Sequence, residues 1–209
     1  MIRNIVFNIL LLIICIFLPF KASCESSSVK TSLFDVGIEN TRLIYGQYTF
    51  RNHFTGRLNV SVFSEKLGFQ YIRATLGYQT SFKTINVSAK YFFGSAFNHS
   101  YYNTGVRVAA DAVFVKRLLV DATIAPWYDS GYKYETCWEA KIGCRITKNI
   151  DIKAGYTTLP EYRMSEHRII GGFDFHVKQL YVSPYLSIGT NSENGGKNIR
   201  VVFGFGYQF

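Results

Sequence analysis

The chain has 209 residues, of which 48% are apolar, 17% are aromatic and only 18% carry a charge. This composition, with only 4 Pro, excludes a disordered or collagen-like chain, and 4 Cys are too few for a disulfide-dense scaffold. The formal net charge of +9 raises the question of nucleic-acid binding. The basic residues are spread along the chain with acidic residues between them, so nucleic acid is not an expected partner.

The N-terminal segment has the three-part pattern of a secretory signal peptide. Arg3 gives it a positive start, an apolar run of about a dozen residues covers Ile9–Phe20, and small residues follow as far as Cys24. The apolar run is short for a bilayer-spanning helix, and no second run of about 18 apolar residues follows it. We therefore expect residues 1–24 to be a signal peptide and residues 25–209 to form the folded protein. A membrane anchor and a lipid-modified Cys24 are the alternatives.

From Thr31 onward the dominant pattern is strict alternation of apolar and polar residues, with almost no helical period. The earliest runs are the least regular, because Phe69 and Tyr71 share a face with Arg73. The predicted strands are, in chain order, Ser32–Glu39, Leu43–Arg51, Gly56–Ser64, Gly68–Gln79, Thr84–Phe93, Thr104–Val115, Leu118–Tyr128, Tyr134–Ile146, Ile150–Thr158, Arg168–Lys178, Leu180–Thr190 and Ile199–Phe209.

Alternation within one strand fits two all-β architectures. A soluble sandwich would bury the apolar face of each strand, whereas a transmembrane barrel turns that face to lipid. The predicted strands are about ten residues long, which is enough to cross a hydrocarbon core when they are tilted. The connections alternate between short ones, such as Lys178–Gln179, and longer ones, such as Asp129–Lys133. We therefore predict an all-β fold, a transmembrane antiparallel up-and-down β-barrel of about 12 strands, with 8 or 10 strands as alternatives.

In such a barrel the polar faces of the strands point into the lumen, with Lys178 at the end of one of them. The predicted lumen-lining charges are Arg57, Arg73, Lys90, Arg107, Asp111, Asp121, Glu135, Glu139, Lys141, Arg145, Asp151, Lys153, Arg168, Asp174 and Arg200. In a narrow barrel these charges would pair and fill the lumen, whereas in a wider barrel they would line a wet channel. Twelve strands lie between the two limits, so both hypotheses stay open. A slight basic excess predicts a mild preference for anions if the lumen conducts.

Candidate catalytic and metal-binding residues are few. The 4 His show no His-x-x-x-His spacing and there is no Cys-x-x-Cys, so neither a metal nor another cofactor is expected. Two predicted loops combine the residue types that an outer-leaflet lipid-modifying enzyme would need: His99 with Ser100, and His167 with Ser165 and Glu166. Nothing in these loops fixes a base against a nucleophile, so we assign no catalytic residue.

Cys137 and Cys144 lie in one predicted strand and are seven positions apart. An odd separation places two side chains on opposite faces of a strand, where they cannot form a disulfide with each other. We therefore expect both to be unpaired.

Phe203, Phe205, Tyr207 and Phe209 place an aromatic ring at four alternate positions and the sequence ends on a Phe. This pattern resembles the terminal strand of bacterial outer-membrane β-barrel proteins. In that superfamily such a C-terminal aromatic pattern is the signal that the barrel-assembly machinery recognises. The segment Ser183–Gly189 is similar to the Pro-Tyr…Gly penultimate strand of small barrels in the same group.

The resemblance identifies a superfamily and not a function. It implies export to the bacterial outer membrane, contact with membrane lipid and lipopolysaccharide, and assembly by the barrel-assembly machinery with periplasmic chaperones. The leading functional hypothesis is a non-enzymatic, porin-like barrel with a narrow channel for small hydrophilic solutes. A structural barrel with a closed, charge-filled lumen and an outer-leaflet lipid-modifying enzyme are the alternatives. The solute and the oligomeric state are left open.

Overall fold

The computed structural model describes residues 33–39, 43–51, 53–61, 71–97, 100–115, 117–131, 133–159, 167–190 and 199–209. The predicted signal peptide, residues 1–24, lies outside the described residues. Within the described part of the chain, no helix is long and apolar enough to cross a membrane.

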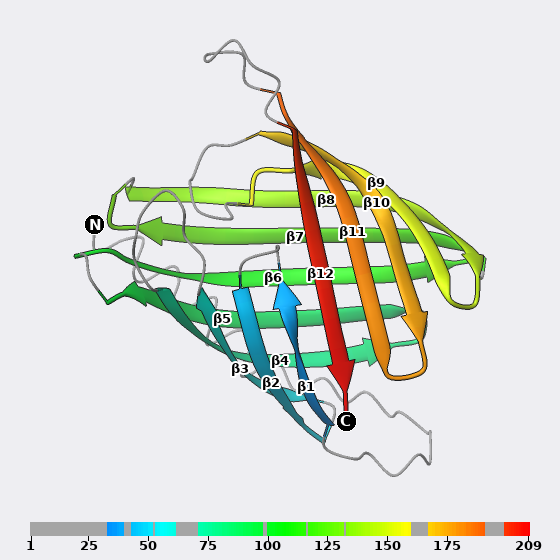
Figure 1. Cartoon of the computed structure of the whole chain (residues 1–209), viewed down its shortest axis with the longest axis horizontal. Coiled ribbons are helices and arrows are strands. Elements are labelled where there is room, and N and C mark those ends of the chain that lie inside the picture. The colour runs from blue at the N-terminus through cyan, green and yellow to red at the C-terminus, as the bar shows by residue number, and fades with distance from the viewer. Residues whose placement is uncertain are drawn as a thin grey trace.

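The described residues form twelve strands that close into one barrel (Figure 1). Each strand pairs antiparallel with its neighbours in the chain, and β1 pairs with β12. The predicted all-β antiparallel barrel of 12 strands is therefore confirmed, and the alternatives of 8 or 10 strands are wrong. The strands are β1 (Leu33–Glu39), β2 (Leu43–Phe50), β3 (Phe54–Ser61), β4 (Tyr71–Phe82), β5 (Ile85–Ala96), β6 (Tyr102–Phe114), β7 (Leu118–Asp129), β8 (Lys133–Thr147), β9 (Ile150–Thr157), β10 (Arg168–Val177), β11 (Leu180–Gly189) and β12 (Ile199–Gln208).

The largest displacement from the prediction is in β4. The strand predicted over Gly68–Gln79 spans Tyr71–Phe82, and its ladder with β5 continues as far as the pair Phe82↔Ile85. The polar residues 79–81 resemble a loop in sequence. In the hairpin they remain in the ladder, because the connection to β5 is the two-residue turn 83–84.

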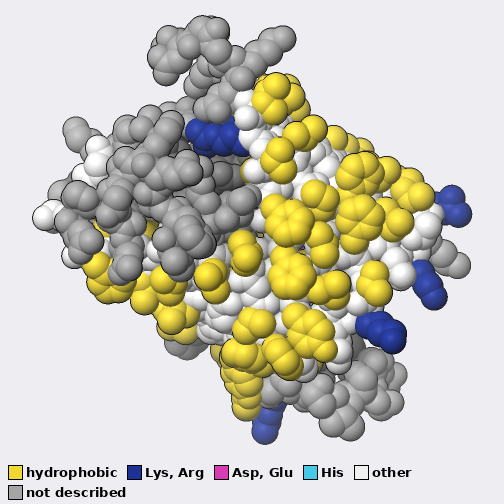
Figure 2. Space-filling view, viewed as in Figure 1, with side chains coloured by type: hydrophobic (Ala, Val, Ile, Leu, Met, Phe, Trp, Pro, Cys, Tyr) yellow, Lys and Arg dark blue, Asp and Glu magenta, His cyan; other side chains and the backbone are white. Residues whose placement is uncertain are grey.

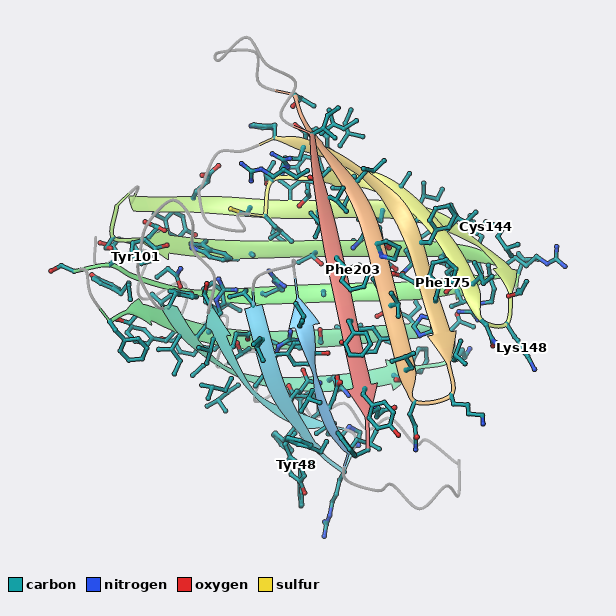
Figure 3. All side chains as sticks on the ribbon, viewed as in Figure 1. Tyr48, Tyr101, Cys144, Lys148, Phe175 and Phe203 are labelled. Carbon is teal, nitrogen blue, oxygen red and sulfur yellow. The ribbon has the colours of Figure 1, made fainter. Side chains whose placement is uncertain are left out.

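The two ends of the barrel differ in their connections. The turns 51–53, 83–84, 115–117, 148–149 and 178–179 lie at one end, which we call the short-turn end. The start of β1 and Phe209 lie at this end too, because Asp35 pairs with Gln208. The opposite, long-connection end holds the connections 40–42, 62–70, 97–101, 130–132, 158–167 and 190–198. Figure 3 shows Tyr101 and Lys148 at opposite ends of the molecule.

One predicted connection and one predicted luminal position need correction. The longer loop predicted over Asp129–Lys133 reduces to residues 130–132, because β7 and β8 stay paired as far as Asp129↔Lys133. Lys178, predicted to end a strand on the luminal face, is instead the first residue of the turn 178–179, with a positive φ of 55° and an exposed side chain.

The outward face of the barrel is apolar. Every second residue of the described strands points away from the lumen, and none of these outward positions holds a charged side chain. Leu76, Val201 and Ile142 are among the most exposed, at 69%, 66% and 60%. Apolar side chains also cover β10–β12 on the face shown in Figure 2. Such a continuous apolar surface is unfavourable in water and suits a surrounding of lipid.

The two described cysteines lie on opposite faces of β8, as expected. Cys137 is buried on the inward face, Cys144 is exposed on the outward face, and both are free thiols.

Candidate functional site

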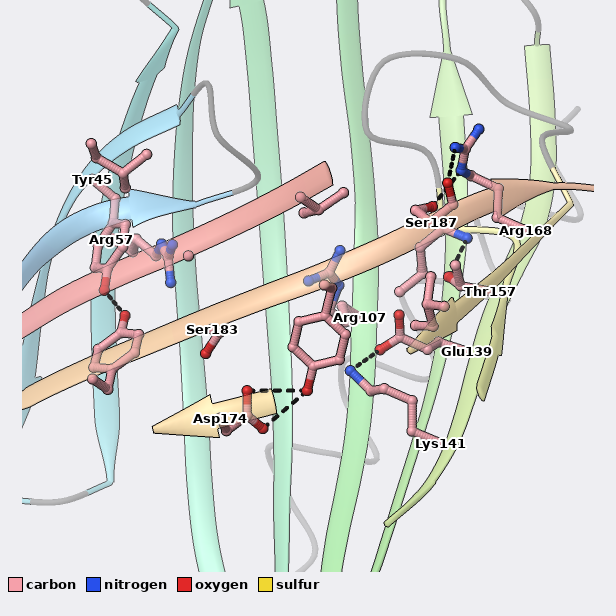
Figure 4. A pocket seen from close by; sticks show the side chains of 17 residues that line it. Tyr45, Arg57, Arg107, Glu139, Lys141, Thr157, Arg168, Asp174, Ser183 and Ser187 are labelled. Atoms are coloured by element: carbon pink, nitrogen blue, oxygen red, sulfur yellow. Dashed lines mark hydrogen bonds and ion pairs between the residues drawn. The ribbon is translucent and has the colours of Figure 1, made fainter. Parts of the chain in front are cut away.

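A cavity of about 380 Å³ lies inside the barrel (Figure 4). Strands β1–β3, β6 and β8–β12 contribute its lining. Along β11 the lining residues run from Tyr181 to Ser187, which at about 3.3 Å per residue covers roughly 20 Å of the wall. The cavity is therefore elongated along the strands, in the direction that leads from one end of the barrel to the other.

The lining of the cavity has an excess of positive charge. Four of its side chains are cationic and two are anionic. Within this set, Lys141 Nζ lies 2.7 Å from Glu139 Oε1, so this cation is paired inside the lining. Field lines concentrate between low-dielectric walls, so the predicted anion preference would depend on this excess, and it stays a prediction here. The charged lining residues are Arg57, Arg107, Glu139, Lys141, Arg168 and Asp174.

Arg168 is fixed against the wall near the long-connection end. Its side chain is at the start of β10 and the residue is only 4% exposed. Its Nε donates to Ser187 Oγ at 2.6 Å and a terminal nitrogen donates to the Ser187 carbonyl at 3.0 Å. These bonds to β11 hold a buried guanidinium at a defined place beside the cavity.

A network of paired charges closes the cavity on the side of β7, β9 and β10. Lys153 Nζ lies 2.8 Å from Asp121 Oδ2 and 3.2 Å from Asp174 Oδ2, so one ammonium bridges two carboxylates. The Tyr185 hydroxyl donates to both oxygens of Asp174, at 3.0 and 3.1 Å. This part of the lumen is filled by cross-paired side chains.

Three tyrosines place rings on the cavity wall: Tyr45, Tyr181 and Tyr185. The hydroxyls of Tyr45 and Tyr181 are hydrogen-bonded to each other, and the Arg57 guanidinium lies 3.7 Å from the centre of the Tyr45 ring. Because Tyr45 is on β2 and Tyr181 is on β11, this bridge crosses β1 and β12, the two strands that close the barrel. Gly206 makes room for it, since a Cβ there would overlap the Tyr181 ring.

The opposite wall, at the long-connection end, is filled by an aromatic cluster made of Tyr71, Phe92 and Trp127. The Arg73 guanidinium lies 5.4, 5.3 and 5.2 Å from the centres of these three rings, within range of a cation–π interaction. Arg73 Nε also donates to the Tyr71 hydroxyl at 2.8 Å. The cluster occupies the lumen beside β4, β5 and β7, and none of these three strands contributes a residue to the lining of the cavity.

Tyr101, the residue before β6, connects this cluster to Asn103 on β6 and Asp129 at the end of β7. Its hydroxyl donates to Asp129 Oδ2 at 2.5 Å and accepts from Asn103 Nδ2 at 3.0 Å, while Tyr71 donates to Asn103 Oδ1 at 2.7 Å. Burial, and then the hydrogen bond to Asp129, raise the pKa of Tyr101 above its ordinary value. The phenol therefore stays protonated and keeps donating.

The remaining predicted lumen residues lie away from the cavity. Arg145 and Asp151 form a bidentate pair, with distances of 3.0 and 3.2 Å. Asp111 is exposed and accepts from Asn86 at 2.6 Å. Lys90, Glu135 and Arg200 are half-buried at inward positions of β5, β8 and β12. Of the fifteen predicted residues, the cavity therefore brings six together, and whether any of them selects a solute stays a prediction.

Sequence reasoning had Tyr71 on the same face as Arg73, but it missed most of the aromatic lining of the lumen. Tyr71, Phe92 and Trp127 each occupy a position on the polar face of their strand, as do Tyr45 and Tyr181. The sequence does contain a signal for these residues, because each shares a strand face with charged or polar residues. If the charged side chains face the lumen, an aromatic side chain on the same face points into the lumen too.

The four terminal aromatic residues are on the outward face of β12 and its end. Phe203, Phe205 and Tyr207 are each 37% exposed. The Phe209 backbone N–H donates to the Phe34 carbonyl at 2.8 Å, and their rings lie 6.0 Å apart. The final residue is thus attached to the first strand, where the barrel closes.

The candidate enzyme residues are only partly described. His99, Ser165 and Glu166 lie outside the described residues. The His167 ring is hydrogen-bonded to the Tyr156 hydroxyl, a group on an outward position of β9. No group of His, Cys, Asp and Glu suited to a metal ion occurs among the described residues.

Comparison with known proteins relates the chain to others by structure alone. No protein-family model matches it, and no curated protein does. The KdgM porin in complex with disordered oligogalacturonate has a TM-score of 0.55 and 13% identity, covering 86% of this chain and 98% of that chain. A structure from a study of in-meso crystallization of membrane proteins has a TM-score of 0.57 and 7% identity, covering 85% and 83%.

An outer membrane channel from Pseudomonas putida F1 has a TM-score of 0.48 and 10% identity, covering 85% of this chain and 93% of that chain. At such low identities a structural likeness identifies the fold and not the function. The chain has the closed β-barrel fold of the membrane porins.

Proposed function

We propose that the protein is a non-enzymatic, porin-like barrel of the bacterial outer membrane that conducts small hydrophilic solutes and prefers anions. The observation that carries this proposal is the elongated cavity with its excess of cationic side chains, inside a barrel whose outward strand positions are uncharged. The likeness in fold to the KdgM porin supports it.

The channel we propose is narrow, because one part of the lumen is filled by side chains and another part is open. The Lys153 network and the aromatic cluster fill much of the interior, as in a closed barrel. The cavity of about 380 Å³ could hold about a dozen water molecules at roughly 30 Å³ each. That space suits ions and solutes of the size of a simple sugar or amino acid.

Acidic sugars are one solute class that this chemistry would accept. Carboxylates would be attracted by Arg57, Arg107 and Arg168, while the rings of Tyr181 and Tyr185 offer flat surfaces for a sugar. The KdgM porin, which shares the fold, has been solved with oligogalacturonate.

Single-channel recording in a planar bilayer tests the proposal. The refolded protein should give discrete conductance steps, and in a salt gradient the reversal potential should indicate that chloride passes more readily than potassium. Arg107→Gln should lower this anion preference, whereas the matched variant Arg117→Gln, which changes an exposed turn residue, should not. Silence from protein shown to be folded by its heat-modifiable gel mobility would refute conduction, and a cation preference would refute the charge argument.

Export and assembly form part of the same proposal. We infer that residues 1–24 direct export and that the outward aromatic positions ending in Phe209 are recognised by the barrel-assembly machinery. Deletion of Phe209 should lower the amount of protein in the outer membrane. An unchanged amount would refute that role, and altered lipid A in a strain lacking the protein would instead support the lipid-modifying alternative.

A further inference from the structure

All five turns at the short-turn end contain a basic residue, and none contains Asp or Glu. Five of these basic residues are described and each is exposed. We call these five residues the basic turn ring; they are Arg51, Lys83, Arg117, Lys148 and Lys178. Figure 2 shows Lys and Arg side chains along the edge of the apolar surface, separated from one another. A uniform sign in five independent turns points to a common anionic partner.

The backbone of these turns does not explain the choice of residue. Arg51, Lys83 and Lys178 have φ values of 47°, 53° and 55°, and each is the first residue of its turn. Gly, Asn and Asp enter this left-handed region most readily, and they are the usual residues of such tight hairpin turns. Three turns therefore hold a cation where another residue would fit the backbone better.

Two contacts show on which side of the wall these cations lie. The Arg51 guanidinium is 5.1 Å from the centre of the Phe50 ring, and Lys83 Nζ is 5.5 Å from the centre of the Phe82 ring. Phe50 and Phe82 are outward residues, 45% and 61% exposed. The two cations thus lie over the outer surface of the barrel and not over the mouth of the lumen.

This position matches the level of phospholipid headgroups. Basic side chains next to the edge of an apolar belt extend their charged ends into the interfacial layer while their carbon chains cover apolar surface. Anionic lipids attract such residues, and the attraction adds up over several Lys and Arg side chains. The outward strand positions next to the turns are uncharged in the described residues, so the turns supply the charge at this boundary.

We propose that the basic turn ring binds the headgroups of anionic phospholipids in the leaflet at the short-turn end. The inference rests on the proposed membrane location but not on conduction. It assigns to the turns a lipid preference that the luminal arginines do not supply.

Lipid selection by the whole barrel tests this inference. The refolded protein is placed in vesicles of phosphatidylcholine with phosphatidylglycerol, without lipopolysaccharide, and spin-labelled lipids report which headgroup is enriched at its surface. We expect at least about twofold enrichment of phosphatidylglycerol, decreasing in high salt. Enrichment should disappear when the ring is neutralised with R51Q, K83Q, R117Q, K148Q and K178Q, and persist in the charge-conserving control with R51K, K83R, R117K, K148R and K178R.

Two outcomes would overturn the inference. One is the absence of phosphatidylglycerol enrichment around the original protein. The other is an unchanged enrichment around the neutralised variant; if this variant has also lost the anion preference in single-channel recordings, the cations belong to the mouth of the channel. If the neutralised variant fails to fold, the double variant Lys148→Gln with Lys178→Gln is tested instead, and it should partly reduce the phosphatidylglycerol enrichment. A silent barrel that still enriches phosphatidylglycerol would refute the proposed channel and leave the lipid site standing.

Discussion

Lys153→Met should destabilise the barrel strongly, because it removes the ammonium that bridges two carboxylates. Lys153, Asp121 and Asp174 have side chains only 18%, 19% and 14% exposed, and the ammonium–carboxylate distances are 2.8 and 3.2 Å. At an effective dielectric constant of about 20, each pair attracts by roughly 5 kcal/mol before the loss of hydration is counted. Methionine would leave two partly buried carboxylates in place with no cation between them.

Most of this attraction is offset by the hydration that the charges lose. Removing one partner from a buried pair typically costs 3–5 kcal/mol, and we expect about 3 kcal/mol here because all three groups keep some exposure. The assay is urea unfolding of the refolded protein in lipid vesicles, followed by tryptophan fluorescence. Trp127 inside the barrel and Trp138 on its outward face both report on unfolding.

A double variant and a surface control make the test specific. Asp121→Asn in the Lys153→Met background should recover about half of the lost stability, since a single carboxylate then remains and Tyr185 still donates to it. Lys148→Met, at an exposed turn, should change the free energy of unfolding by less than about 0.5 kcal/mol. A loss below about 1 kcal/mol for Lys153→Met, or no recovery in the double variant, would refute the reasoning.

Three further outcomes are expected. Gly94→Ala should destabilise the barrel by about 1–3 kcal/mol in the same unfolding assay, because a Cβ at this position would overlap the Tyr71 hydroxyl; wild-type stability would contradict this. Arg73→Ala should raise single-channel conductance at least about 1.5-fold by opening the part of the lumen that Arg73 fills, and an unchanged conductance would mean that this part carries no current. A lipid-soluble maleimide should modify Cys144 and not Cys137 in the folded protein, by mass spectrometry; equal labelling would place Cys137 at an accessible surface.

The fold was predictable because lipid imposes a simple rule on the strands. In β10, for example, Ile169, Phe173 and Phe175 alternate with Arg168 and Asp174, and this contrast repeats in strand after strand. A period of two fixes which residues share a face whether or not the partner strands are known. The even count of strands and the short turns at one end then follow from the same pattern.

The partners of the luminal charges were not predictable in the same way. Lys153 on β9 reaches both Asp121 on β7 and Asp174 on β10, so its contacts depend on the register of several strands at once. Alternation predicts that these side chains face the lumen, but it does not predict their positions along the barrel axis and so does not predict which of them are in contact. The aromatic cluster was missed for a related reason, since Trp127 looks like a lipid-facing residue until Asp129 and Asp121 are seen to share its face.

The closure between β1 and β12 has a consequence for how the barrel folds. Among the described residues, four ladder pairs register across it, from Asp35↔Gln208 to Ile38↔Phe205, and they join positions about 170 residues apart in the chain. Bringing such distant segments together costs about 4–5 kcal/mol in chain entropy, whereas each neighbouring hairpin needs only a short loop. Closure is therefore expected to be the last and slowest event of folding, after the hairpins have formed. The hydrogen bond between Tyr45 on β2 and Tyr181 on β11 then adds a contact on the luminal side. It stabilises the closure, where the ladder between β1 and β12 has four pairs.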